Sequence, residues 1–164
     1  MSYYPPVGFY FKVKFEGLDK DLADDVQFQS VSGLSTDIET EEYAEGGENR
    51  FKHKLPTRIK FPNLVLKRGL FKDSSIIKWC EDAIENFKFK PLNLIISLYS
   101  ESQSEGQGSS GSKENKPLVS WKITHAIPVK WSIDELSSMD SKLVMETLEL
   151  TYNYFKIEVN ANWN

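Results

Sequence analysis

Alternation of apolar and polar residues along the chain predicts a protein built mainly from β-strands. The clearest case is the segment 9–15, where aromatic and valine side chains occupy every second position and lysines occupy two of the positions between them. Such period-two alternation is typical of a strand with one buried face. Other strands are predicted from the same alternation and from runs rich in β-branched residues. They cover about 26–31, 36–43, 51–56, 58–67, 92–99, 118–127, 129–133 and 143–159, the last being the longest.

One segment has the periodicity of a helix, at about 74–87. Its apolar side chains recur at three- and four-residue spacing, which gives an amphipathic helix one buried stripe. The stripe consists of Ile76, Ile77, Cys80, Ile84 and Phe87. Asp73 or Ser74 can cap the first turn, and Pro91 stops the helix.

These elements predict a mainly β fold class, an antiparallel β-sandwich or barrel with one packed α-helix at about residues 74–87. Strands and helices do not alternate, which argues against the doubly wound and (β/α)₈ enzyme architectures. The length of 164 residues fits a single domain, 1–164. Within it, the segment at about 100–116 is rich in serine and glycine and has no apolar residue, so we expect a flexible loop.

Composition narrows the function classes. The net charge of −4 argues against a globally basic nucleic-acid binder, and no apolar run is long enough for a membrane helix. The N-terminus lacks the pattern of a signal peptide, so we expect synthesis in the cytoplasm. One cysteine and two histidines make a zinc site within one chain improbable. We therefore expect no catalytic, cofactor-binding or metal-binding residues.

Charge is sharply divided between two neighbouring blocks. Residues 37–48 contain six acids and no base, and residues 50–72 contain eight bases and no acid. Separated blocks of this kind can pair within one hairpin or bring copies of the chain together head to tail. The pattern alone leaves both interpretations open.

A ligand site has weaker support. Gly46 and Gly47 lie between β segments and beside acids, whereas a phosphate cradle needs glycines at the start of a helix. The alternative to an assembly protein is a monomeric β-sandwich or barrel that binds a ligand or peptide. Its pocket would be lined by Trp121, His125 and Trp131.

Several motifs together resemble one family. They are Ser32-Gly33-Leu34, the segment 43–49 (YAEGGEN), Leu66-Lys67-Arg68-Gly69, Ala126-Ile127-Pro128-Val129-Lys130-Trp131 and the segment 145–152 (METLELTY). In this order the chain resembles the tail-tube proteins of contractile injection systems and contractile phage tails, relatives of the haemolysin-coregulated tube protein of type VI secretion. The serine- and glycine-rich segment 101–116 departs from the family pattern.

The resemblance implies a structural protein whose hexameric rings stack into a hollow inner tube. A sheath drives such a tube through a target envelope to deliver cargo, and the implied partners are further copies of the chain with sheath, baseplate and cap proteins. Protein or DNA cargo would pass the lumen, and the assembled phage tail-like particle would be released or docked on a membrane. The family uses a long loop after the third strand for contacts within and between rings, here about 42–55. The implied interface residues are Tyr43, Glu45, Gly46, Gly47, Glu48, Asn49, Arg50 and Leu55.

Overall fold

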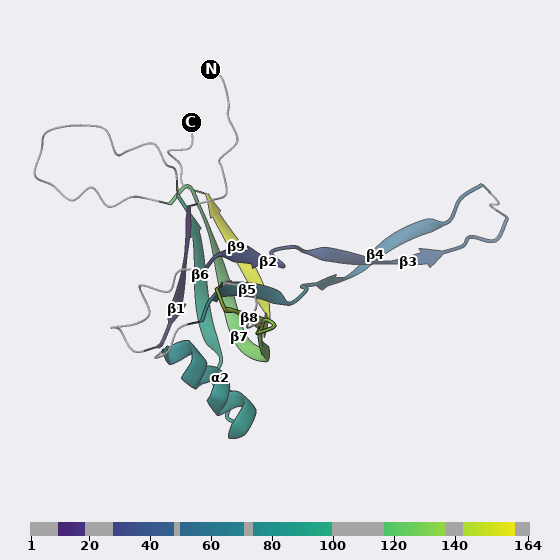
Figure 1. The fold of residues 1–164 in the computed structure, drawn as a ribbon. Helices are drawn as coiled ribbons and strands as arrows, with labels where there is room; N and C mark the ends of the chain where they lie inside the picture. Colours follow the sequence, from purple (N-terminus) through teal and green to yellow (C-terminus); the bar gives the residue numbers. More distant parts are fainter. Residues whose placement is uncertain are drawn as a thin grey trace, which may run out of the picture.

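The computed structural model describes residues 10–18, 28–47, 50–70, 74–99, 117–136 and 143–159. Most of these residues lie in antiparallel strands, and one helix packs beside them, which confirms the predicted fold class (Figure 1). The strands are β1 (Phe11–Glu16), β2 (Ser30–Ser32), β3 (Asp37–Tyr43), β4 (His53–Lys60), β5 (Leu64–Gly69), β6 (Leu92–Leu98), β7 (Val119–Ile133), β8 (Met145–Thr151) and β9 (Tyr154–Val159), and the helix is α2 (Ser75–Glu85). The predicted loop at about 100–116 lies outside the described residues.

Strand β7 organises the main sheet because it belongs to both of its halves. Its first half pairs with β6 on one side and β9 on the other, and β6 pairs with β1. Its second half pairs with β8, which is followed by β5 and β2. The chain stays in strand conformation through Pro128, which lies between the predicted strands 118–127 and 129–133. Pro128 has no backbone N–H to donate to β8, and the pairing of β7 with β8 shifts its register between Pro128 and Lys130.

The long predicted run at 143–159 is interrupted, so β7, with 15 residues, is the longest described strand. Strands β8 and β9 lie on the same side of β7 and are separated at Tyr152 and Asn153. Opposite this point β7 contains His125, whose φ of 57° marks an irregular position. The Asn153 amide donates to the Thr124 carbonyl at 3.1 Å, so the pairing is restored just beyond the interruption.

The core lies between the two halves of the sheet and helix α2. Its fully buried members include Phe15, Leu64, Leu66, Leu94, Ile123 and Leu150. Burial of their apolar area is the main favourable contribution to folding. The alternation in β8 places Leu148 and Leu150 inward, as the pattern predicts.

Helix α2 confirms the predicted cap but corrects the predicted buried stripe. The Ser74 hydroxyl accepts from the Ile76 amide at 3.2 Å, as an N-cap does. Ile84 and Phe87, however, are 57% and 81% exposed, and Trp79 and Ala83 are buried. Trp79 holds the helix in this rotation, since its indole N–H donates to the Lys90 carbonyl at 2.8 Å.

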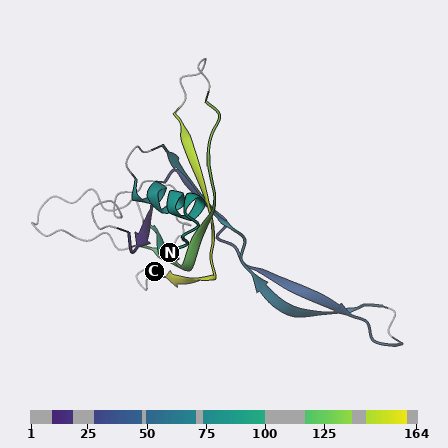
Figure 2. The same ribbon diagram turned by 90° about the horizontal axis from the view of Figure 1, so that it is seen from below.

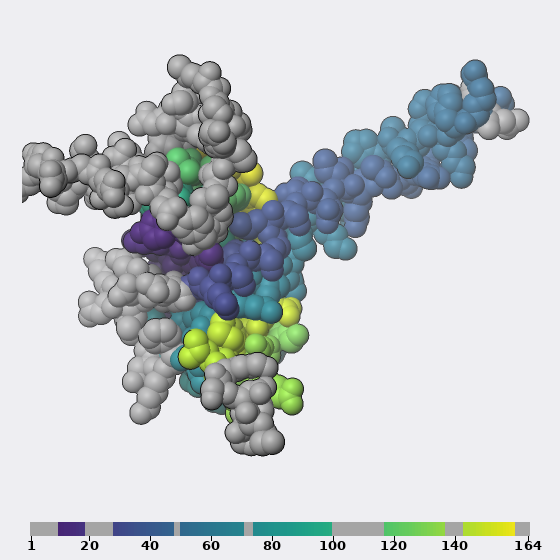
Figure 3. Space-filling model, turned by 45° about the horizontal axis from the view of Figure 1, so that its top comes forward, coloured from purple at the N-terminus to yellow at the C-terminus, as the bar shows by residue number. Residues whose placement is uncertain are grey.

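Strands β3 and β4 form a separate two-stranded ribbon, which we call the arm and define as residues 37–60 as far as they are described. It extends from the body of the molecule between β2 and β5 (Figures 1, 2 and 3). The predicted strand 58–67 is interrupted around Pro62, because β4 ends at Lys60 and β5 begins at Leu64. Strands β3 and β4 include only the two ends of the expected long loop at 42–55, since β3 reaches Tyr43 and β4 starts at His53, and residues 44–47 and 50–52 between them are not in strands.

Candidate assembly surface

Both faces of the arm carry apolar and charged side chains. Ile38 lies directly opposite Ile59 on one face, and the register shift between Ile38 and Thr40 places Leu55, opposite Glu41, on the other face. The register also places Asp37 opposite Lys60 and Glu42 opposite Lys54. Both faces are open to solvent, because every residue of β3 and β4 is exposed.

The charge blocks face each other within this hairpin. Besides the opposed strand positions, the Lys52 ammonium lies 3.3 Å from the Glu42 carboxylate. His53 Nε2 lies 3.8 Å from Glu45 Oε1 near the end of the arm. Of the two interpretations of the charge pattern, pairing within one chain is therefore the one that the structure shows. Exposed pairs of this kind contribute little stability, about 0–1 kcal/mol each.

The exposed apolar side chains are the unusual part of the arm. Ile38, Tyr43, Leu55 and Ile59 expose between 52% and 62% of their surface. A two-stranded ribbon is marginal on its own in water, and contiguous exposed apolar side chains mark interaction sites. The arm therefore has the properties of a contact element that another molecule covers.

The structure gathers most of the predicted interface residues at the end of the arm. Tyr43 and Leu55 lie on one face of the arm, opposite the face of Ile38 and Ile59, and Glu45 lies beside His53. Gly46 and Gly47 form a turn in which Gly47 has a φ of +100°, a conformation that favours glycine. Glu48 and Asn49 lie outside the described residues, and Arg50 is exposed.

Sequence reasoning missed Ile38 and Ile59 as candidate contact residues. Each is a lone apolar residue in a charged segment, which by itself predicts nothing. Their significance comes from the register, because a direct cross-strand pair of isoleucines makes one apolar patch. The available signal in the sequence was the acidic block 37–48 followed directly by the basic block 50–72, since two such blocks can pair across a turn.

Strand edges add a second open surface. In the described part of the chain, β1 pairs only with β6, β2 only with β5 and β9 only with β7. Each of these strands therefore has one edge without a strand partner there. Unpaired edges are templates for strand pairing with another chain.

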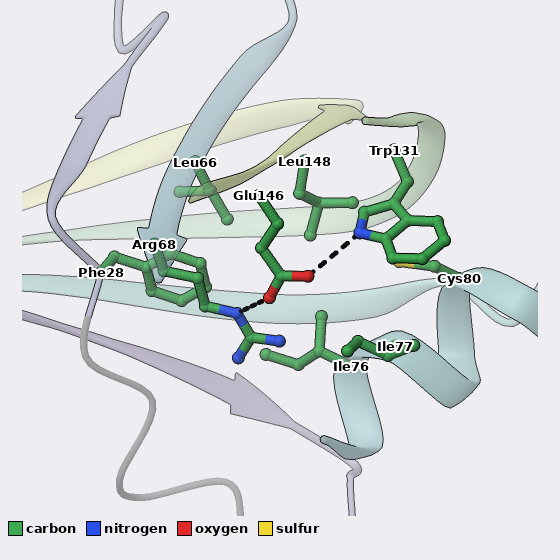
Figure 4. Close-up of a pocket in the computed structure, with 9 residues that line it drawn as sticks. All are labelled: Phe28, Leu66, Arg68, Ile76, Ile77, Cys80, Trp131, Glu146 and Leu148. Atoms are coloured by element: carbon green, nitrogen blue, oxygen red, sulfur yellow. Dashed lines mark hydrogen bonds and ion pairs between the residues drawn. The ribbon is translucent and has the colours of Figure 1, made fainter. Parts of the chain in front are cut away.

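The interior of the body contains a polar network rather than a ligand pocket (Figure 4). The buried Arg68 guanidinium forms an ion pair with Glu146 and donates to the Ser74 hydroxyl at 2.8 Å. The Trp131 indole donates to the second oxygen of Glu146 at 3.1 Å. Arg68 also lies over the Phe28 ring, 5.6 Å from its centre. The network joins β5, β7, β8 and the start of α2.

The cavity beside this network has a volume of about 10 Å³, which is at most the space of one water molecule. The three side chains of the predicted ligand pocket do not meet there. Trp131 lines the cavity, Trp121 is half-buried against the core, and His125 is exposed. The geometry therefore does not support the ligand-binding alternative.

The search for metal ligands covered the described ranges only. Within them, no group of three or more His, Cys, Asp or Glu side chains lies together in a way that could hold a metal ion.

No helix within the described ranges has both the length and the apolar character needed to span a membrane.

Cys80 faces the same cavity and is 1% exposed. Burial, reinforced by the nearby Glu146 carboxylate, raises the pKa of the thiol from 9.0 to about 12. The unfolded chain loses this proton at lower pH than the folded chain, so the stability from the neutral thiol is complete below pH 9 and falls between pH 9 and about 12.

We expect the Cys80→Ala variant to lack this part of the alkaline destabilisation. In the wild-type chain, the thiol lowers the free energy of unfolding by about 1.4 kcal/mol for each pH unit in this range. Denaturant unfolding of both chains at several pH values above 9 measures it, because the two chains differ only at Cys80. Parallel curves for the two chains would contradict the prediction.

An arm with exposed apolar side chains, open strand edges and a filled interior together define a subunit of a larger protein assembly. The chain belongs to the T4-like virus tail tube protein gp19 family, whose model matches residues 7–156. It is thus a tail tube protein, of the kind that contractile injection systems and phage tails contain, and its role is that of a structural conduit. A comparison with curated protein sequences finds no match.

Solved structures agree with this family. A chain of the anti-feeding prophage baseplate, determined with six-fold symmetry, is 27% identical, with a TM-score of 0.81 over 96% of this chain and 98% of that one. A chain of the PVC extracellular contractile injection system sheath–tube complex is 20% identical, with a TM-score of 0.74 over 96% and 93%. Hcp1 from Flavobacterium johnsoniae is 14% identical, with a TM-score of 0.56 over 93% and 97%, and shares the fold.

Proposed function

We propose that six copies of this chain form a ring and that the rings stack into the hollow inner tube of a contractile particle. The observation that carries the proposal is the arm, four of whose apolar side chains are more than half exposed in the single chain. Its projection from the body suits it to reach a neighbouring subunit (Figure 3). The six-fold symmetry of the similar baseplate structure supports the ring number. A ring of six has a mass of about 113 kDa, six times 18.9 kDa.

The end of the arm is the proposed contact between rings. Its residues are Tyr43, Glu45, Gly46, Gly47, Glu48, Asn49, Arg50 and Leu55. A contact that joins two different surfaces repeats without closing, which is what a stacked tube requires. The mixture of acids and bases at this end suits a surface that meets a complementary partner.

We expect the double variant Glu45→Lys, Glu48→Lys to form rings but no tubes. Reversing two charges replaces attraction across the stack by repulsion, while contacts elsewhere in the ring are unchanged. Negative-stain electron microscopy and light scattering distinguish the two products. The matched control is Glu81→Lys, Glu85→Lys, which changes the net charge equally at exposed positions of α2, away from the arm. Tubes of normal length from the first variant would show that these charges are not part of the stacking contact.

The partners and the location of this chain follow from the same proposal. Chains similar to this one occur in structures of a baseplate, a tube-terminating cap and a sheath–tube complex. The partners of this chain are accordingly its own copies and the sheath, baseplate and cap proteins, with protein or DNA cargo in the lumen. The chain is made in the cytoplasm, enters a phage tail-like particle and performs no catalysis. Residues 1–164 act as one tail-tube domain with a flexible loop at about 100–116.

A further inference from the structure

The half of the main sheet made of β1, β6, β7 and β9 has one face in the core and one face that carries charge. Phe15, Leu94 and Ile123 are buried on the core face, and the Phe15 ring lies 6.0 Å from the Trp79 ring of α2. Strand alternation directs the residues between them to the opposite face. We call that opposite face the lysine face. Its charged members, all of them exposed, are Lys12, Lys14, Glu16, Lys122, Lys156 and Glu158.

The register of the strands brings three of these lysines into one row across the sheet. Lys14 lies opposite Ile95, Ile95 lies opposite Lys122, and Lys122 lies opposite Lys156. Side chains directly opposite each other on paired strands are close neighbours, and like charges in that arrangement are destabilising. Lys122 and Lys156 therefore add a repulsion to the folded chain that a neutral residue at either position would avoid.

Protection of strand edges explains only part of this row. Lysines on edge strands discourage unwanted pairing, and β1 and β9 are edge strands in the described part of the chain. Lys122, however, lies on β7 between β6 and β9, so it protects no edge. Its ion pair with Glu158, at 2.7 Å, joins side chains that are 49% and 57% exposed and so contributes little to stability. The position of Lys122 therefore favours a role toward a partner outside the single chain.

The lysine face has an excess of positive charge in a chain whose net charge is −4. It carries four lysines and two glutamates among the described residues. The Lys12 ammonium lies 5.8 Å from the centre of the Tyr99 ring, and the Lys156 ammonium lies 5.9 Å from the centre of the Tyr154 ring. Cation–π contacts at exposed sites are weak, so these ammonium groups remain accessible to an anionic partner.

In the proposed tube, the lysine face is the face of this half-sheet that suits the wall of the channel. The opposite face packs against the core and α2, so it cannot border an open channel. Within the described residues, β1 and β9 each have one edge without a strand partner, so copies of the chain can continue the half-sheet side by side around the channel. The positive excess of the face is then repeated in every subunit along the channel.

An acidic protein segment matches this face better than a nucleic acid does. Its carboxylates are spaced along a flexible chain, so they can meet the lysines and avoid Glu16 and Glu158. A nucleic acid carries an unbroken series of phosphates, which the two glutamates repel. The lysine face also has no arginine, the side chain that holds a phosphate at two points, because the arginines of the chain are residues 50, 58 and 68. Contacts of exposed lysines are screened by salt and reversible, as passage through a conduit requires.

We propose that the lysine face binds the carboxylates of acidic protein cargo, with Lys14, Lys122 and Lys156 as the contact residues. The inference rests on the proposed function and names the chemical class of the cargo. Each contact is weak by itself, and its repetition around the ring supplies the affinity, because one flexible acidic chain can meet several subunits at once.

Assembled rings of the full chain test the inference, with fluorescent poly-L-glutamate as the probe. Rings confirmed by electron microscopy are mixed with the probe at low and at physiological salt, and binding is followed by fluorescence anisotropy. We expect the wild-type rings to bind the probe and to lose affinity as the salt concentration rises. We expect the triple variant Lys14→Gln, Lys122→Gln, Lys156→Gln to bind about tenfold more weakly or less, because three contacts are lost in every subunit. The three positions are exposed, so the variant should still form rings.

The matched control is Lys67→Gln, Lys78→Gln, Lys88→Gln, which removes the same charge at exposed positions of β5, α2 and the segment after α2. We expect it to bind poly-L-glutamate as the wild type does. A single-stranded DNA oligonucleotide of the same charge is the second probe and is expected to bind more weakly. Wild-type rings that do not bind poly-L-glutamate, equal losses in the two triple variants, or tighter binding of the oligonucleotide would overturn the inference and leave the proposed function intact. A wild-type chain that forms no ring would contradict the proposed function instead.

Discussion

The Glu146→Gln variant is expected to lose about 3 kcal/mol or more of unfolding free energy. Glutamine keeps the shape of the side chain but removes its charge, so the guanidinium of Arg68 is left buried without a counter-charge. Breaking one partner of a buried pair costs about 3–5 kcal/mol. For a chain of this length we expect the melting temperature to fall by about 10 °C. Thermal unfolding followed by circular dichroism measures the shift.

Two comparisons isolate the cause. The double variant Arg68→Met, Glu146→Leu removes both charges and is expected to be close to wild type, because the desolvation cost of the pair disappears with it. Glu158→Gln removes a partner of the exposed Lys122–Glu158 pair, 2.7 Å apart, and should cost less than about 1 kcal/mol. A Glu146→Gln variant as stable as Glu158→Gln would show that the buried network does not hold β5, β8 and α2 together.

The Gly33→Ala variant is expected to lose about 3 kcal/mol. Gly33 lies between β2 and the arm, with a φ of +93° that disfavours other residues. A Cβ atom there would lie 2.1 Å from the backbone oxygen of Asn63, so the main chain itself would have to move. The Gly33 carbonyl also accepts from the Tyr152 hydroxyl at 3.2 Å, a bond that this movement would weaken. Denaturant unfolding measures the loss.

Gly47→Ala is the matched control for the backbone conformation. Gly47 has a φ of +100°, but a Cβ atom there would meet nothing within 4 Å. We expect it to cost about 1 kcal/mol, which is the conformational penalty alone. Gly46→Ala, with ordinary φ and open space, should be neutral. Equal losses for Gly33→Ala and Gly47→Ala would contradict the steric explanation.

The amino-acid pattern predicts the strands and the helix because these depend on local periodicity. It also predicts an N-cap at Asp73 or Ser74, and Ser74 is the cap in the structure. It fails at Ile84 and Phe87, which it places in the buried stripe of the helix. Periodicity shows that one side of a helix is apolar, but the rotation is fixed by Trp79 and its bond to Lys90.

The sequence pattern does not predict contacts between residues that are far apart in the chain. Arg68 and Glu146 are 78 residues apart and meet because β5 and β8 pair in the register that places them opposite each other. The available signal was Glu146 itself, which lies in phase with the buried Leu148 and Leu150 of β8. The charge blocks predict an exposed, charged element, but its projection as an arm depends on packing that the other strands provide.

The oligomeric state of the purified chain tests the central claim most directly. Negative-stain electron microscopy, with light scattering for the mass, is made over a range of protein concentrations. The account predicts rings of about 113 kDa, six times the 18.9 kDa chain, alone or stacked into tubes. A particle of 18.9 kDa at every concentration would contradict it, because the arm and the strand edges would then be exposed in the functional molecule.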